Sequence, residues 1–240
     1  MATTQKQTHR LQSLHTLKTV TAPSVADQVF DVLQQRILSL KLSPNTKISE
    51  VEVAKMLGVS RQPVRESFKR LAKLGFLDIR PQSRTTISLI SEDAVLRARF
   101  IRSALEVKTI QAASLQLDEP DHAALSGIID EQRAAIGAED VDKFHSLDEA
   151  FHMQICDRAG LGFVWDVILD CKAHMDRVRR LSLDEGAQHV TLNEHIEILN
   201  ALKRRDTELA ADAMTRHLDR ILVLINSLKA QNHDWFTTSQ

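Results

Sequence analysis

Helical periodicity dominates the C-terminal part of this chain. From Ser91 to about Asn232, apolar residues recur every three to four positions, which is typical of amphipathic helices. The pattern is interrupted at Glu119-Pro120, near Gly137, at Gly160 to Gly162, at Gly186 and near Arg205-Asp206. An amphipathic helix is stable only when its apolar face is covered, so the pattern predicts about six helices packed against one another. We therefore expect an all-α antiparallel bundle over residues 91–232.

The composition also favours a mostly α protein. Aromatic residues make up 4% of the 240 residues, tyrosine is absent, and glycine (7) and proline (5) are scarce. The two cysteines, Cys156 and Cys171, fit neither a disulfide framework nor a cysteine zinc cluster. No apolar run approaches the roughly 18 residues that cross a bilayer. These features predict a cytoplasmic protein that does not contact a membrane.

Charge is distributed unevenly along the chain. Residues 1–90 carry 14 Lys and Arg against 6 Asp and Glu, whereas residues 91–240 carry 17 against 26. This asymmetry is typical of a nucleic-acid-binding module joined to a second domain, with chance clustering as the alternative. We expect a flexible tail over residues 1–22, a DNA-binding domain over 23–90, the bundle over 91–232 and a second tail over 233–240.

Three short helices are predicted in the basic part of the chain. The first covers residues 25–42 and ends at a Ser-Pro pair. A capping box that begins at Ser49 opens the second helix, and Gly58 ends it. Ser60 caps the third helix, which continues to Gly75. The arrangement is that of a helix-turn-helix motif.

A β-hairpin is predicted directly after the third helix. Residues 76–80 and 85–89 alternate in polarity and are rich in β-branched side chains, and Pro81-Gln82-Ser83-Arg84 separates them. A helix-turn-helix followed by such a hairpin is a winged helix, whose last helix enters the major groove of DNA.

Polar side chains at the start of the third helix are the candidates for base contacts. Arg61 and Arg65 are four positions apart, so both leave the same side of the helix and can reach guanine O6 and N7. Gln62 suits an adenine or a phosphate, and Lys69 suits a phosphate. The alternative is that these are ordinary surface charges.

The run from Val25 to Ser88 resembles the winged-helix domain of GntR-family transcription regulators. The resemblance rests on Leu57-Gly58-Val59-Ser60-Arg61-Gln62-Pro63-Val64-Arg65-Glu66, preceded by Ile48-Ser49-Glu50 and followed by Leu71-Ala72-Lys73-Leu74-Gly75. It implies that the protein binds double-stranded operator DNA, and a homodimer is expected because one winged helix reads only a few base pairs.

Two positions depart from that family's pattern. Val51 stands where the family usually has an arginine, which removes one expected DNA contact. Gln82-Ser83-Arg84 stands where the tip of the wing usually carries glycine, so Arg84 becomes the candidate wing contact.

Histidines at helical spacing mark the acidic part of the chain. Asp148 and His152 are one helical turn apart and project from one face, while His195 and His217 lie on the apolar stripes of two later helices. If the four meet inside a bundle, one carboxylate and three imidazoles suit Zn²⁺ or a similar divalent ion. Hydrogen-bonded core histidines are the alternative. Because an imidazole binds metal only when neutral, ion affinity is expected to fall below about pH 6.5.

Residues 93–226 resemble the ligand-binding FCD domain of the FadR-type branch of the same family. The resemblance rests on Arg102-x-x-x-Glu106, Asp148-x-x-Phe151-His152, His195-x-x-Ile198-Leu199 and Arg205-Asp206-x-x-x-Ala210-x-x-x-Met214-x-x-His217. It implies that Asp148, His152, His195 and His217 bind the ion, which is Zn²⁺ or, alternatively, Ni²⁺ or another transition-metal ion. It further implies that the carboxylate of a small organic acid completes the coordination.

Three other positions in this part of the chain receive an interpretation. Arg102 is the candidate for a second contact with the acid, and an intrahelical ion pair with Glu106 is the alternative. Leu161 stands where the family usually has asparagine, which makes the expected pocket more apolar. The pair Arg179-Arg180 is interpreted as a solvated patch.

Together these features predict a transcriptional repressor whose operator affinity is controlled by an organic acid bound beside a metal ion. One alternative is a metal-sensing regulator, in which the ion itself is the signal. Another is a metal-dependent hydrolase, in which the ion activates water. The hydrolase is disfavoured because no nucleophile or recurrent carboxylate motif accompanies the ion, and a fused winged helix has no use in hydrolysis.

Overall fold

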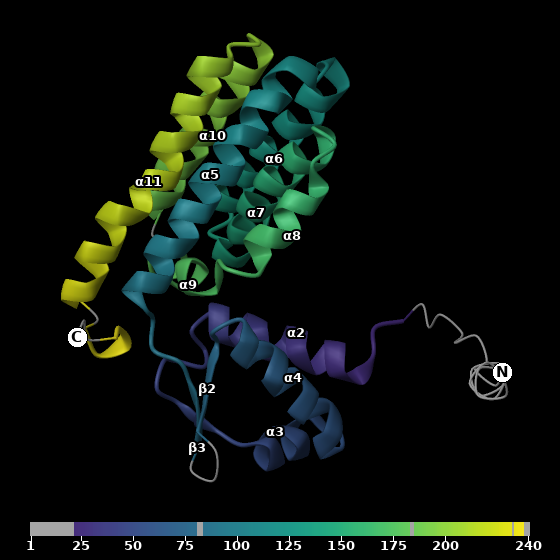
Figure 1. Ribbon diagram of the computed structural model, residues 1–240, viewed down its shortest axis with the longest axis vertical. Helices are drawn as coiled ribbons and strands as arrows, with labels where there is room; N and C mark the ends of the chain where they lie inside the picture. Colours follow the sequence, from purple (N-terminus) through teal and green to yellow (C-terminus); the bar gives the residue numbers. More distant parts are fainter. Residues whose placement is uncertain (1–21, 81–83, 183–184, 232, 238–240) are drawn as a thin grey trace, which may run out of the picture.

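The computed structural model describes residues 22–80, 84–182, 185–231 and 233–237. Figure 1 shows a small N-terminal part with a hairpin beneath a larger helical bundle, so the mostly α fold is as predicted. Most of the predicted N-terminal tail and the wing-tip residues Gln82 and Ser83 lie outside the described residues.

The helices of the N-terminal part are α2 (Val25–Leu38), α3 (Glu50–Leu57) and α4 (Arg61–Lys73). Helix α2 ends four residues earlier than predicted. Gly58 ends α3 in the left-handed conformation, with φ +66°, as its position after the last apolar residue indicated.

The predicted caps are only partly correct. The Ser49 hydroxyl oxygen accepts from the Glu52 N–H at 3.2 Å, but the Glu52 carboxylate accepts from the Ser49 hydroxyl and not from its backbone N–H. Ser60 occupies the N-cap position of α4 but makes no side-chain capping bond. The residue three positions after Ser60, whose backbone N–H usually donates to the cap side chain, is Pro63, which has no N–H.

Three short strands form the wing: β1 (Lys47–Ile48), β2 (Leu77–Arg80) and β3 (Arg84–Ile87). They form an antiparallel sheet in the order β1-β3-β2, in which Arg80 opposes Arg84. The hairpin was predicted, whereas β1 was not, because two residues are too short to show an alternating pattern. The core beneath the wing includes Ile37, Val64, Phe68, Leu71, Phe76 and Ile87.

Seven helices are described in the bundle, one more than the pattern predicted. They are α5 (Glu92–Gln116), α6 (Glu119–Gly137), α7 (Val141–Arg158), α8 (Gly162–Leu169), α9 (Ala173–Leu181), α10 (Glu185–Lys203) and α11 (Thr207–Gln231). The prediction missed the break between α8 and α9, where no glycine or proline stands. The break predicted at Gly186 was wrong in position, since this residue lies inside α10.

One large apolar core and two smaller apolar clusters hold the described part of the bundle together. Helix α5 packs along α11, α6 packs against α7 and α10, and the short α9 lies at the end of the bundle nearest α2 (Figure 1). The buried core side chains include Ile110, Leu125, Phe144, Phe151, Ile198, Leu202 and Met214. Among the residues described, no helix has both the length and the apolar character needed to cross a membrane.

The C-terminal segment differs from the predicted tail. Residues His233–Trp235 form a short 3₁₀ helix, and Phe236 pairs with Ile90 in a parallel bridge. Phe236 is 3% exposed and packs in the apolar cluster that contains Ile90. The segment is too short to show a periodic pattern, and the residue that stabilises it, Ile90, is far away in the sequence. A local pattern therefore could not predict it.

Candidate functional site

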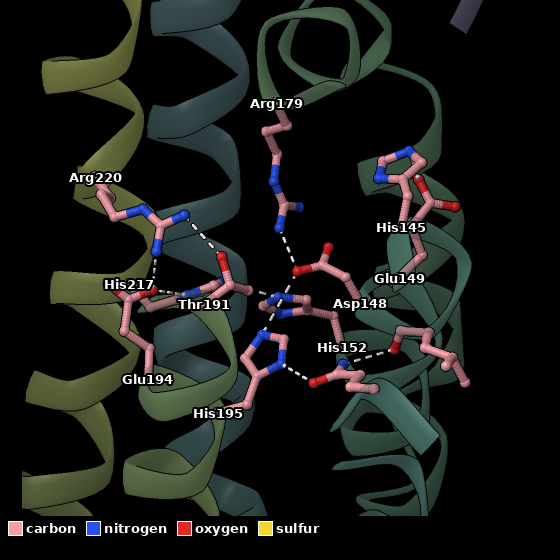
Figure 2. Close-up of polar contacts among 12 residues, drawn as sticks. His145, Asp148, Glu149, His152, Arg179, Thr191, Glu194, His195, His217 and Arg220 are labelled. Carbon is pink, nitrogen blue, oxygen red and sulfur yellow. Dashed lines mark hydrogen bonds and ion pairs between the residues drawn. The ribbon is translucent and has the colours of Figure 1, made fainter. Parts of the chain in front are cut away.

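Four polar side chains from three helices meet inside the bundle. Helix α7 provides Asp148 and His152, α10 provides His195, and α11 provides His217 (Figure 2). One ligand atom from each residue lies within 4.8 Å of the others, and all four residues are buried. The structure therefore brings together the four residues that the sequence singled out.

Polar residues outside this cluster orient the three imidazoles. The Nδ1 atom of each ring lies next to a side-chain oxygen: His152 by Glu106 Oε2 at 2.6 Å, His195 by Gln132 Oε1 at 3.0 Å and His217 by Glu194 Oε2 at 2.8 Å. The Nε2 atoms consequently face the cluster, where those of His152 and His217 are 3.1 Å apart. Holding one ring nitrogen in this way fixes the other as the ligand atom. The sequence did not identify these supporting residues.

Three buried atoms of the cluster residues make no hydrogen bond within the described part of the chain: Asp148 Oδ2, His152 Nδ1 and His195 Nε2. His152 Nδ1 still has Glu106 Oε2 beside it at 2.6 Å, whereas His195 Nε2 lies 3.6 Å from Asp148 Oδ1. Unpartnered buried polar atoms are uncommon in proteins and often mark the place of an ion or ligand. One carboxylate with three imidazoles fits a divalent transition-metal ion such as Zn²⁺.

The protonation states of the cluster suit an ion as well. Burial lowers the pKa of His195 and His217 well below the usual 6.5, and the neighbouring imidazoles lower each further. Both rings are therefore neutral at pH 7, which is the form that binds metal. Burial alone would raise the pKa of Asp148, but Arg179 and the imidazoles hold it well below its ordinary value, so the carboxyl group is ionised.

Arg179 belongs to this site, and the interpretation of Arg179-Arg180 as a solvated patch was wrong. Arg179 donates a hydrogen bond to Asp148 Oδ1 (Figure 2). Arg180 pairs with Asp142. The side chains of both arginines are less than one-sixth exposed. The sequence does not reveal which carboxylate each of these two adjacent arginines contacts, because their partners come from another helix.

A small cavity adjoins the cluster. Its volume is about 20 Å³, and its lining includes Arg102, Arg179, His217 and Arg220. This is close to the space that one water molecule needs. Three guanidinium groups at its wall give it the chemistry of a carboxylate site.

The intrahelical ion pair between Arg102 and Glu106, which was the alternative interpretation of Arg102, is present in the structure. Arg102 Nε donates to Glu106 Oε1 at 2.5 Å, and both side chains are buried. Arg102 Nη2 nevertheless has no hydrogen-bond partner among the residues described. The ion pair and a contact with a ligand in the cavity are therefore compatible.

The candidate DNA-binding side chains lie on the surface of the N-terminal part. Arg61 and Arg65 leave the same side of α4, as predicted, and both contact the Glu50 carboxylate of α3, at 3.5 and 3.1 Å. Their side chains are 60% and 47% exposed. The other candidates, Gln62 and Lys69 on α4 and Arg84 at the start of β3, are exposed.

Both parts of the chain match known protein families. Residues 25–87 match the bacterial regulatory proteins of the gntR family, and residues 98–220 match the FCD domain. The chain is 36% identical over 214 residues to the HTH-type transcriptional repressor RspR of Escherichia coli strain K12, an alignment that covers 89% of this chain and 94% of that protein. The chain belongs to the gntR family of bacterial regulatory proteins.

Further relatives of this gntR-family chain agree. It is 26% identical over 193 residues to the Nta operon transcriptional regulator of Aminobacter aminovorans, covering 78% of this chain and 90% of the relative. The structure of E. coli McbR/YncC shares its fold, with a TM-score of 0.74 and 20% identity over 86% of this chain and all of the other. The named relatives are transcriptional regulators, so the chain is a regulator and the hydrolase alternative is not supported.

The departures from the gntR-family pattern have clear positions in the structure. Val51 is 56% exposed on α3, so the surface of that helix carries an apolar side chain there. Leu161 packs against the apolar core at the start of α8 and does not line the arginine-rich cavity. The expectation that Leu161 makes the effector pocket more apolar stays a prediction.

Proposed function

We propose that this protein is a cytoplasmic operator-binding repressor that acts as a homodimer and responds to a small organic acid bound beside a divalent ion. Residues 23–90 bind the operator, and residues 91–232 bind the effector and form the dimer. Asp148, His152, His195 and His217 hold the ion, with Zn²⁺ as the first candidate. The observation that carries the proposal is the convergence of four buried ligand atoms within 4.8 Å beside a cavity lined by arginines.

The charges around the cavity indicate the class of effector. Three arginines, Arg102, Arg179 and Arg220, each pair with one carboxylate, from Glu106, Asp148 and Glu194 respectively. These six charges cancel, so a divalent ion adds two positive charges to a buried site. Burying net charge without a counterion is costly. An acid with two carboxylates supplies the missing charge, which favours a dicarboxylate over the metal-only signal.

Exposed apolar residues on the bundle support the homodimer. Phe100 on α5 is 70% exposed and Phe163 on α8 is 66% exposed, and these two helices pack together. Exposed apolar side chains mark an interface when they form one contiguous patch, and the homodimer requires this of Phe100 and Phe163. A second copy bound through these two helices would place two winged helices on one two-fold symmetric operator.

The proposal is tested by titrating operator affinity of the full-length protein. The operator is obtained by selection from random duplex DNA with the protein itself, and Zn²⁺, acetate and succinate are added singly and in combination. We expect Zn²⁺ with succinate to change operator affinity at least about tenfold, or about 1.4 kcal/mol, and more than Zn²⁺ with acetate. A full response to Zn²⁺ alone identifies the metal-sensing alternative, and no response to any combination refutes the proposal.

A further inference from the structure

Helix α9 contacts both parts of the protein within nine residues. Ala173, at its first position, is 3% exposed and packs in the core of the winged helix. Met175 and Val178 pack instead in an apolar cluster of the bundle. Figure 1 accordingly shows α9 between the rest of the bundle and α2.

Arg177 of α9 holds the segment that joins the two parts. This residue is fully buried; its Nη1 donates to Ser88 O at 2.6 Å and its Nη2 to Leu89 O at 3.2 Å. One helical turn earlier, His174 Nδ1 accepts from the Ser91 N–H at 3.1 Å. These bonds satisfy backbone groups between β3 and α5, so the path of this segment depends on the position of α9.

The same junction reaches the end of the DNA-binding helix. Gly75, two residues after α4, has φ +80°, and a Cβ atom placed there would lie 2.8 Å from His174 Nε2. The Ser88 hydroxyl donates to Gly75 O at 2.5 Å. His174 of α9 and Ser88 of the joining segment therefore both contact Gly75, just beyond the C-terminal end of α4.

The other end of α9 meets the metal cluster. Arg179, two residues after Arg177, donates to Asp148 Oδ1. A divalent ion bound to Asp148 competes with this guanidinium for the carboxylate and repels its positive charge. An acid entering the cavity displaces side chains too, because about 20 Å³ holds little more than one water molecule.

We propose that α9 couples occupation of the metal site to the orientation of the winged helix, with Arg179 as the sensing residue and Arg177 as the positioning residue at the junction. The inference rests on the function proposed above for the metal site. Binding at Asp148 frees Arg179, α9 shifts, and Arg177 carries the shift to residues 88–91 and to α4.

The experiment follows hydrogen exchange of the full-length protein with and without Zn²⁺. We expect Zn²⁺ to slow exchange in α7, α10 and α11 and to speed exchange of the Ser91 amide at least about tenfold, as weakening of one hydrogen bond predicts. In Arg177→Lys, the bundle should still respond to Zn²⁺ while Ser91 does not. Arg177→Met serves as a second variant if the lysine does not fold.

Two further variants separate the coupling from general destabilisation. Arg179→Gln should exchange at Ser91 as the Zn²⁺-loaded parent does, even without the ion. Arg180→Gln is the matched control, because Arg180 is on the same helix but pairs with Asp142, and it should respond like the parent.

Failure of the coupling is distinguishable from failure of the metal site. Protection of the bundle by Zn²⁺ with an unchanged Ser91 amide overturns the inference and leaves the metal site standing. A retained Ser91 response in Arg177→Lys or Arg177→Met overturns it as well. No protection of the bundle refutes both proposals.

Discussion

Replacing His217 with alanine tests whether the clustered side chains hold an ion. His217 is 7% exposed, and its Nδ1 lies 2.8 Å from Glu194 Oε2. The substitution leaves Glu194 paired with Arg220 at 3.0 Å, so no buried charge loses its last partner. Without any ion, we therefore expect His217→Ala to lower the free energy of unfolding by only about 1–3 kcal/mol.

The ion adds a second difference of similar size between the parent and His217→Ala. An ion that binds only the folded state at a hundredfold excess over Kd stabilises it by about 2.7 kcal/mol. For a chain of this length, that raises the melting temperature by about 5–11 °C, at roughly 2–4 °C per kcal/mol. Loss of one of four ligands weakens the affinity, so the rise in His217→Ala should shrink to less than about 2 °C at the same ion concentration.

The assay combines elemental analysis with thermal unfolding, with and without chelator. His122→Ala is the matched control, because His122 is 5% exposed on α6 and lies outside the cluster. It should lower the melting temperature without changing the metal content or the effect of the chelator. Equal metal content and equal chelator effects in the parent and His217→Ala would refute the reasoning and leave these histidines as core residues.

Three further predictions concern the winged helix and its junction. Arg65→Ala should weaken specific operator binding by about 1–3 kcal/mol, whereas Lys69→Ala should weaken binding to all duplexes alike. Fluorescence anisotropy with labelled duplexes measures both affinities. Unchanged operator affinity in Arg65→Ala would contradict the placement of Arg65 in the groove. Gly75→Ala should lower the free energy of unfolding, measured in urea, by more than Gly58→Ala does. Both glycines have a positive φ, but of the two only Gly75 has a side chain, that of His174, within 4 Å of an added Cβ atom. Equal losses would mean that His174 moves aside freely. Burial and the nearby Arg177 lower the pKa of His174 to about 3, so the unfolded chain binds more protons between that value and about 6.5. Stability from this group is complete above about pH 6.5 and is lowered by roughly 2–3 kcal/mol at pH 4.5. A flat pH profile of the difference in stability between the parent and His174→Gln would contradict this prediction.

The metal site should also tolerate more acid than the sequence suggested. Free imidazole predicts loss of ion affinity below about pH 6.5. Because burial and neighbouring rings lower the pKa of His195 and His217 well below that value, protons compete with the ion only at lower pH.

Local features of the sequence were sufficient to predict most helices of this protein. Caps and periodicity act within a few residues, so Ser49 and Gly58 delimit α3, and the four-residue spacing places Asp148 and His152 on one face. The same local pattern did not predict β1 or the segment that contains Phe236, since each is stabilised by a distant partner.

Only the tertiary structure decided the surroundings of the metal cluster. The sequence placed His195 and His217 on apolar helix faces, but helix packing determines that Glu106, Gln132 and Glu194 stand behind the rings. Periodicity tells which face of a helix is buried and not which group lies opposite it. For that reason Arg179 and Arg180 looked alike in the sequence, and only the packing of α9 against α5 and α11 brought Arg179 to the Asp148 carboxylate of α7.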